Sequence, residues 1–184
     1  MKIKVGVMGS ATEADPENKE ALTQKAEELG RLIAQHDLVL LTGATTGVVY
    51  VVGKAAHLAN GLHVGISPAH NAHEHTDVFK LPTDACDVII YTGFGLKGRN
   101  VVLVRSCDIV LFVAGGMGSL NEFTIAHDEQ KVIGCLLGTG GVADQADQLL
   151  QKFSKTTGAR VLLDADPKRL LDACLNAVAT RPHT

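Results

Sequence analysis

Short apolar segments alternate with longer amphipathic segments along most of the chain, and this alternation constrains the fold more than any other feature. Segments of strand length cover residues 3–8, 38–41, 62–66, 88–91, 109–113, 132–137 and 160–163. Helical spacing of apolar residues predicts helices over 18–35, 47–60, 100–106, 120–127, 143–152 and 167–179. Strands without a polar face belong in a parallel sheet that helices cover on both sides. The sequence therefore predicts an α/β fold with one Rossmann-like domain over residues 1–184, a doubly wound parallel sheet with helices on both faces.

The composition excludes several classes of partner. The net charge is −3 at pH 7 and aromatic residues make up 4% of the chain, with no Trp. A nucleic-acid binder needs a basic surface, and a single-strand binder also needs aromatic stacking platforms, so no nucleic acid is expected. No stretch of 18 apolar residues and no secretory signal occur, so neither a membrane partner nor export is expected and the cytoplasm is the predicted location.

One loop interrupts the alternation. Residues 67–87 carry His70, His73, Glu74 and His75 in close order. The spacing of these histidines is loose, and neither a cysteine nor a predicted helix frames them as ligands, so a metal site is not predicted. A solvated loop, or a lid that closes over a ligand, is the expected structure.

Three glycine turns follow strands and precede helices. The first holds Gly9 and Ser10, and the other two run over residues 43–47 and 115–119. Such turns leave backbone N–H groups free at a helix N-terminus, where the helix dipole favours an anion. One turn of this kind serves equally well as a simple chain reversal, but three with hydroxyls indicate a phosphate-bearing ligand. The predicted ligand-binding residues are Gly9, Ser10, Gly43, Thr45, Thr46, Gly47, Gly115, Gly116, Gly118 and Ser119.

Two better-known phosphate motifs do not hold. Gly93, Gly95 and Gly98 have the spacing of the dinucleotide fingerprint, but the following strand ends at Val113-Ala114, without the acidic residue that would bind a ribose. Gly53-Lys54 is followed by Ala55 where a Walker A motif has Ser or Thr. Neither a dinucleotide site nor a P-loop is therefore predicted.

A longer motif is more specific. The stretch from Gly115 to Glu122, GGMGSLNE, resembles the GGxGTxxE motif of the Lonely Guy (LOG) family, also called lysine-decarboxylase-like. The similarity extends over most of the chain, and Arg99 stands at the family's distance before the motif. Residues 98–119 are especially similar to the bacterial branch of the family that is related to molybdenum-cofactor carrier proteins.

This resemblance implies a function. LOG enzymes hydrolyse the N-glycosidic bond of nucleoside 5′-monophosphates, releasing free base and ribose 5-phosphate without a cofactor. Arg99 and Glu122 match the family's catalytic pair, and Gly115, Gly116, Gly118 and Ser119 match its phosphate loop. The resemblance also implies a homodimer or a higher homo-oligomer, although the amphipathic helices of this chain fit a monomer equally well.

The chemistry of the two candidate catalytic residues leaves their roles open. A carboxylate at residue 122 can stabilise an oxocarbenium-like sugar or deprotonate water. A guanidinium at residue 99 can bind the phosphate in a bidentate way or steady the departing base. We expect Glu122 in the first turn of a helix, where the dipole would lower its pKa and favour a base or electrostatic role. The competing interpretation is a helix-start acid and a surface cation.

Departures from the family pattern keep a second function in view. Ala114 stands where many LOG enzymes have Pro, Ser119 replaces Thr, and Asn100 follows Arg99 where the enzymes have Lys. The alternative is therefore a non-enzymatic carrier that holds the molybdenum cofactor, or another phosphorylated ligand, on the same loops. Because aromatic residues are few, the phosphate and ribose should carry most of the recognition in either case, and selectivity for the base should be weak.

Overall fold

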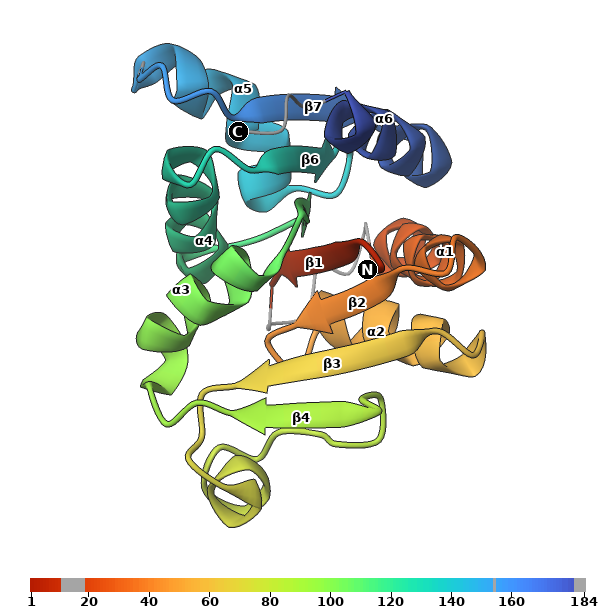
Figure 1. Cartoon of the computed structure of the whole chain (residues 1–184), viewed down its shortest axis with the longest axis vertical. Coiled ribbons are helices and arrows are strands. Elements are labelled where there is room, and N and C mark those ends of the chain that lie inside the picture. The colour runs from red at the N-terminus through yellow and green to blue at the C-terminus, as the bar shows by residue number, and fades with distance from the viewer. Residues whose placement is uncertain (11–18, 154, 181–184) are drawn as a thin grey trace.

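The computed structural model describes residues 1–10, 19–153 and 155–180, and within them one parallel sheet forms the centre of the molecule (Figure 1). Its strands are β1 (Lys4–Gly9), β2 (Val39–Thr42), β3 (Leu62–Ser67), β4 (Val88–Tyr91), β5 (Ile109–Val113), β6 (Val132–Leu136) and β7 (Arg160–Asp164). The helices are α1 (Lys19–Gln35), α2 (Val48–Leu58), α3 (Gly95–Ser106), α4 (Met117–Asp128), α5 (Gly141–Lys152) and α6 (Pro167–Ala179). The predicted α/β fold is confirmed.

The order of the strands shows where a ligand site should lie. The sheet runs β4-β3-β2-β1-β5-β6-β7, and every adjacent pair is parallel. The chain builds outward from β1 to the β4 edge and then returns to place β5 on the other side of β1. In sheets of this kind ligands bind beyond the carboxyl ends of the strands, at this reversal. Gly9 ends β1 and Val113 ends β5, so the reversal point lies between two of the predicted glycine turns.

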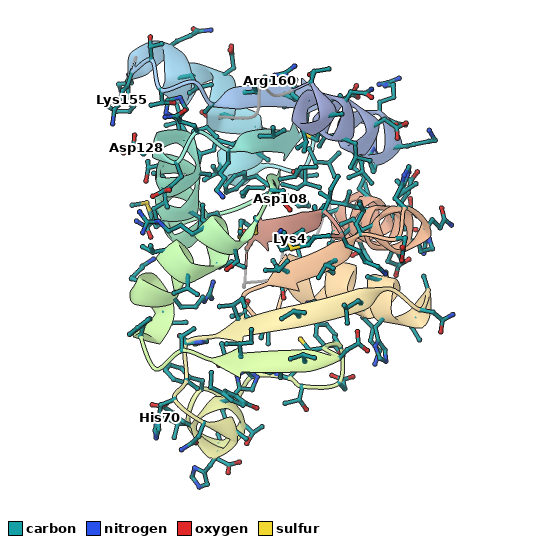
Figure 2. The ribbon with its side chains drawn as sticks, in the orientation of Figure 1. Lys4, His70, Asp108, Asp128, Lys155 and Arg160 are labelled. Atoms are coloured by element: carbon teal, nitrogen blue, oxygen red, sulfur yellow. The ribbon has the colours of Figure 1, made fainter. Side chains whose placement is uncertain are left out.

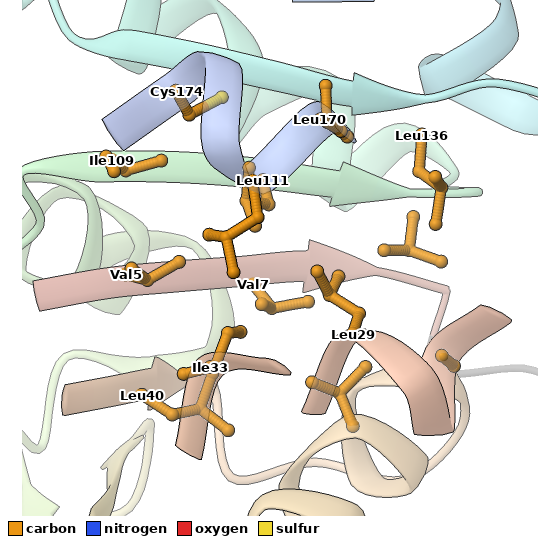
Figure 3. Close-up of a cluster of buried hydrophobic side chains, with 14 of the residues drawn as sticks. Val5, Val7, Leu29, Ile33, Leu40, Ile109, Leu111, Leu136, Leu170 and Cys174 are labelled. Carbon is orange, nitrogen blue, oxygen red and sulfur yellow. The ribbon is translucent and has the colours of Figure 1, made fainter. Parts of the chain in front are cut away.

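Alternating strand residues supply two hydrophobic cores. Val5 and Val7 of β1 face the layer of α1, α2 and α6, where they meet Leu29, Ile33 and Leu170 (Figure 3). The other face of the sheet packs against α3, α4 and α5. There Phe112 of β5 meets Phe123 of α4 edge to face, with 5.4 Å between ring centroids. Burial on both faces accounts for strands that are almost wholly apolar.

The four cysteines are all free. Cys107, Cys135 and Cys174 are buried, whereas Cys86 is only half-buried. No helix among the described residues is both long and apolar enough to cross a membrane.

The loop of residues 67–87 differs from the prediction. It contains one π-helical turn over Glu74–Val78, and His75 is fully buried. The Pro82 carbonyl, 3.1 Å away, can only accept, so Nε2 of His75 donates to it and Nδ1 accepts from the Ser67 hydroxyl at 2.8 Å. His70 stays exposed and bonds Glu74 (Figure 2). His75 is thus a hydrogen-bonded core residue and not part of a solvated loop. The described residues contain no group of side chains that could hold a metal ion.

Two helices begin about one turn earlier than predicted. The helix expected from Asn100 starts at Gly95, and the helix expected from Leu120 starts at Met117. Both extra turns contain glycine, which has a low intrinsic helix propensity and so hides a helix start in the sequence. These two turns carry cleft residues, so the difference bears directly on the site.

Candidate functional site

A cleft of about 360 Å³ opens at the carboxyl ends of β1 and β2 and is walled by the first turns of α3 and α4. Most of the predicted site residues line it: Gly9, Ser10, Gly43, Thr45, Arg99, Gly116, Gly118, Ser119 and Glu122. Thr46, Gly47 and Gly115 are not among the lining residues. Gly47 instead precedes the first turn of α2 with a φ of 79°, and the loop 67–87 contributes no residue to the lining of the cleft.

The loop that carries Gly115 is held from behind by α5. The N–H groups of Val142 and Ala143 donate to the carbonyls of Gly115 and Ala114, at 2.9 and 3.0 Å. On the other side of the loop, the Gly115 N–H donates to the Ser10 hydroxyl at 3.2 Å. Gly115, with a φ of 112°, is therefore a structural element behind the cleft wall rather than an exposed contact. The positive φ explains why glycine stands there.

The first turn of α4 faces the cleft with its amide groups. Gly116 precedes the helix, and no side chain caps its N-terminus. A Cβ added to Gly116 would meet no atom of the described residues within 4 Å, so this backbone is open to an incoming group. The unpaired N–H groups and the positive end of the helix dipole make this turn suitable for an anion.

Arg99 and Glu122 meet inside the cleft. Arg99 Nη1 donates to Glu122 Oε1 at 3.2 Å and to the Asn100 side-chain oxygen, also at 3.2 Å. Both residues of the pair are 6% exposed, so the interpretation of Arg99 as a surface cation is wrong. The guanidinium lies against Gly43, where an added Cβ would come within 2.5 Å of Nη2. Nε of Arg99 is buried without a hydrogen-bond partner among the described residues.

The pKa of Glu122 moves in the direction opposite to the one expected from the helix dipole. Glu122 is the sixth residue of α4 and not part of its first turn, so the dipole acts on it weakly. Burial raises its pKa to about 7, and this outweighs the opposing effects of Arg99 and Lys97. Burial also lowers the pKa of Arg99, against the influence of Glu122. The single hydrogen bond of 3.2 Å between Arg99 and Glu122 does not offset the cost of removing water from the two charged groups.

The raised pKa predicts a pH-dependent stability. A carboxyl whose pKa is higher in the folded state than its ordinary 4.5 contributes stability that is fully present below 4.5 and is lost as the pH rises through about 7. The free energy of unfolding should therefore fall between pH 5 and 8, by up to about 3 kcal/mol. Urea denaturation of the wild type and Glu122→Gln across this range measures the effect.

The comparison of the two proteins isolates Glu122 from other titrating groups. Burial lowers the pKa of His63, and this shift acts with the opposite sign, since it removes stability as the pH falls below 6.5. The His63 contribution is common to both proteins and cancels in the difference. Parallel pH profiles for the wild type and Glu122→Gln would contradict the shift assigned to Glu122.

The sequence did not single out several cleft residues. Lys97 and Leu96 lie in the first turn of α3, and Met117 begins α4. Lys97 and Leu96 fall inside the Gly93–Gly98 stretch, whose glycine spacing is that of the dinucleotide fingerprint. The signal that would have found them is the position of Arg99 on the same helix, two residues after Lys97. No aromatic residue is among the lining residues that the structure describes, which fits the expected weak role of stacking.

The reversal in strand order defines this chain as a Rossmann-like protein, and its cleft contains a helix start that no side chain caps. The chain belongs to the SLOG cluster4 family, whose model matches residues 2–171. The predicted resemblance to the LOG branch that is related to molybdenum-cofactor carriers is therefore confirmed.

Relatives with high similarity come from several sources. An uncharacterized protein of Archaeoglobus fulgidus is 34% identical over 134 residues, which cover 73% of this chain and 80% of that protein. The molybdenum cofactor binding protein of Rippkaea orientalis is 31% identical, with a TM-score of 0.78 over 98% of this chain and 99% of the other. The molybdenum cofactor carrier protein of Chlamydomonas reinhardtii is 27% identical, with a TM-score of 0.76 over 98% and 100%.

Proposed function

We propose that the cleft binds a small phosphorylated ligand, a nucleoside monophosphate or a pterin phosphate, with the phosphate against the first turn of α4. The observation that carries this proposal is the uncapped start of that helix, which opens into a cleft lined by Gly116, Gly118 and Ser119. Amide donors and a positive dipole end together favour an anion at this position.

We further propose hydrolysis of an N-glycosidic bond as the reaction of this cleft. Glu122 with a pKa of about 7 is partly ionised at neutral pH, which is the condition that suits a general base. It would take a proton from water as the water oxygen bonds to the sugar carbon. The bond from that carbon to the base nitrogen breaks, its electron pair leaves with the base, and a proton from solvent neutralises the base. Arg99 holds the carboxylate in place and faces the same cleft.

Carriage of the ligand without turnover is the second candidate. Proteins that bind or carry the molybdenum cofactor are 27–31% identical to this chain over nearly its whole length. A carrier needs the phosphate-binding backbone and a pocket, both of which the cleft offers. The Arg99–Glu122 pair would then shape the pocket rather than react.

One pair of assays separates these functions. The protein is incubated with AMP, GMP, CMP and UMP, and free base and ribose 5-phosphate are measured, while calorimetry reports binding of the same nucleotides and of molybdopterin. Release of base supports hydrolysis. Binding of any of these ligands without release supports carriage. Failure to bind both the nucleotides and molybdopterin would overturn the proposed phosphate site.

We also propose that two or more copies assemble. Val88 and Ile90 on the edge strand β4 are each about half exposed, at 49% and 48%. They lie in register with Val64 and Ile66, which belong to the face of the sheet that packs on α3. This exposed apolar strip continues the layer that a second copy would cover.

Assembly of two or more copies predicts the molar mass of the protein in solution. Light scattering should give at least twice the 19.4 kDa of the chain, and Ile90→Glu should shift the mass toward one copy because it puts a charge in the apolar strip. Leu58→Glu is the matched control, since Leu58 is exposed on α2, on the opposite face of the sheet. A wild-type mass of one chain would contradict the proposal.

A further inference from the structure

Lys97 is a cleft cation that the described residues leave without a partner. It is the third residue of α3, and none of the hydrogen bonds or ion pairs among the described residues includes its ammonium group. Its Nζ lies 3.6 Å from the point that a Cβ on Gly118 would occupy. The ammonium group therefore stands over the first turn of α4, beside the amides assigned above to the phosphate.

The other cation of the cleft is already compensated. Arg99 is paired with Glu122, and the same Nη1 also donates to Asn100. Its charge therefore holds the carboxylate in position, and less of it is available to an incoming anion. Lys97 also acts inside the cleft, because its charge lowers the pKa of Glu122. Among the described lining residues, Lys97 is left as the cation that can meet a new negative charge.

The wall at the helix start carries no side chain at residues 116 and 118. Gly116 and Gly118 supply that part of the wall, and an added Cβ at Gly116 would meet nothing within 4 Å. A phosphate placed there is within reach of the amides of α4 and of Lys97 together. A cation close to the helix start stabilises a second negative charge on the phosphate, and the ammonium group of Lys97 lies close to Gly118.

We propose that Lys97 is a specificity-determining residue that neutralises the terminal phosphate, so that the cleft prefers a phosphate monoester dianion to a phosphodiester. The inference rests on the proposed phosphate site and adds to it the class of ligand. Charge-assisted hydrogen bonds of this kind are the stronger ones, and the exposed ammonium of Lys97 should be worth about tenfold in affinity. A mononucleotide or a pterin monoester fits this preference, and an internal diester linkage does not.

The test uses probes that carry no base or sugar. Methyl phosphate (a dianion above pH 7) and dimethyl phosphate (a monoanion) are titrated at pH 8 into the full chain, and backbone amide shifts of residues 116–119 are followed by NMR. We expect methyl phosphate to bind at least fivefold more tightly than dimethyl phosphate. Lys97→Gln should weaken methyl phosphate binding about tenfold and remove the preference, and Lys97→Arg should restore most of it.

A matched control removes the same charge elsewhere. Lys155 pairs with Asp128 at 2.7 Å, at the end of α4 opposite to Gly118 (Figure 2), so Lys155→Gln should bind methyl phosphate like the wild type. Gly118→Ala is a second variant. The added Cβ would lie at an ordinary contact distance from Lys97, and alanine favours a helix more than glycine does. Gly118→Ala should therefore leave the melting temperature unchanged or raise it, while it weakens the binding of methyl phosphate.

The two proposals fail in different ways. If the wild type shows no shift at residues 116–119 with either probe at millimolar concentration, the phosphate site itself is wrong. If the wild type binds methyl phosphate and Lys97→Gln binds it equally well, or if Lys155→Gln loses as much affinity, the phosphate site stands and the role of Lys97 is refuted. Equal affinity of the wild type for the two probes also refutes the preference for a dianion.

Discussion

Glu122→Gln is expected to lower the release of free base from a nucleoside monophosphate by at least about 100-fold while leaving phosphate binding within about threefold. Loss of a general base commonly costs 10²–10⁴ in rate. The amide of glutamine keeps an oxygen that accepts from Arg99 Nη1, so the geometry of the pair is retained and the proton-accepting carboxylate is lost. Base release is measured under single-turnover conditions, and binding is measured on the same preparations.

The chain offers a matched control on the same pair of helices. Arg105 of α3 bonds Glu129, the residue that follows α4, with Nη2 to Oε1 at 2.6 Å on the surface. Glu129→Gln alters an Arg–Glu pair of the same chemistry outside the cleft and should release base at the wild-type rate. If Glu122→Gln cleaves as fast as the wild type, Glu122 is not the base. If Glu129→Gln is equally slow, the loss does not come from the cleft.

Gly141→Ala is expected to have the largest effect on stability among single-methyl additions in the cleft region. A Cβ at this position would come within 2.2 Å of the Gly115 carbonyl oxygen and 2.8 Å of the Gly115 nitrogen, and backbone atoms cannot swing aside as side chains do. The φ of 57° adds about 1–2 kcal/mol of strain for a residue with a Cβ. Together with the overpacking, the loss should reach about 3–5 kcal/mol.

Gly140, the neighbouring glycine, separates the effect of backbone strain from the effect of the steric clash with Gly115. Gly140 also has a positive φ, 85°, but an added Cβ would meet no atom of the described residues within 4 Å. Gly140→Ala should therefore cost the backbone strain alone, about 1–3 kcal/mol for this φ and ψ, and urea denaturation should show a smaller loss than for Gly141→Ala. Phosphate binding should weaken in Gly141→Ala alone, because the displaced loop carries the start of α4. Equal stability of the two variants would contradict the assigned contact.

The sequence predicted the fold well because the strand signals were strong and local. The predicted strands over 88–91 and 109–113 and the predicted helix over 167–179 have the observed bounds. The errors fall where glycine or tertiary contacts decide the structure. The first turn of α3 begins with Gly95 at a φ of 66°, and the π-helical turn depends on the burial of His75, which no local pattern reveals.

The candidate site was predictable in its backbone and less so in its electrostatics. Glycine turns after strands located the cleft, because parallel strands bring their carboxyl ends to one edge of the sheet. The pKa of Glu122 depends on burial by residues distant in sequence, so the sign of its shift was predicted wrongly. The sequence did not indicate Lys97, because Lys97 lies near Gly118 only through the packing of α3 against α4.

The hydrogen bonds from α5 to the loop before α4 affect how far the sequence of this loop can vary. In a trans peptide the C=O and N–H point in opposite directions. Because the carbonyls of Ala114 and Gly115 point to α5, the N–H groups of Gly115 and Gly116 point away from α5, and the Gly115 N–H indeed reaches Ser10. The polarity of this wall is therefore set by main-chain orientation. Side chains at neighbouring positions can diverge between relatives without turning these N–H groups toward α5.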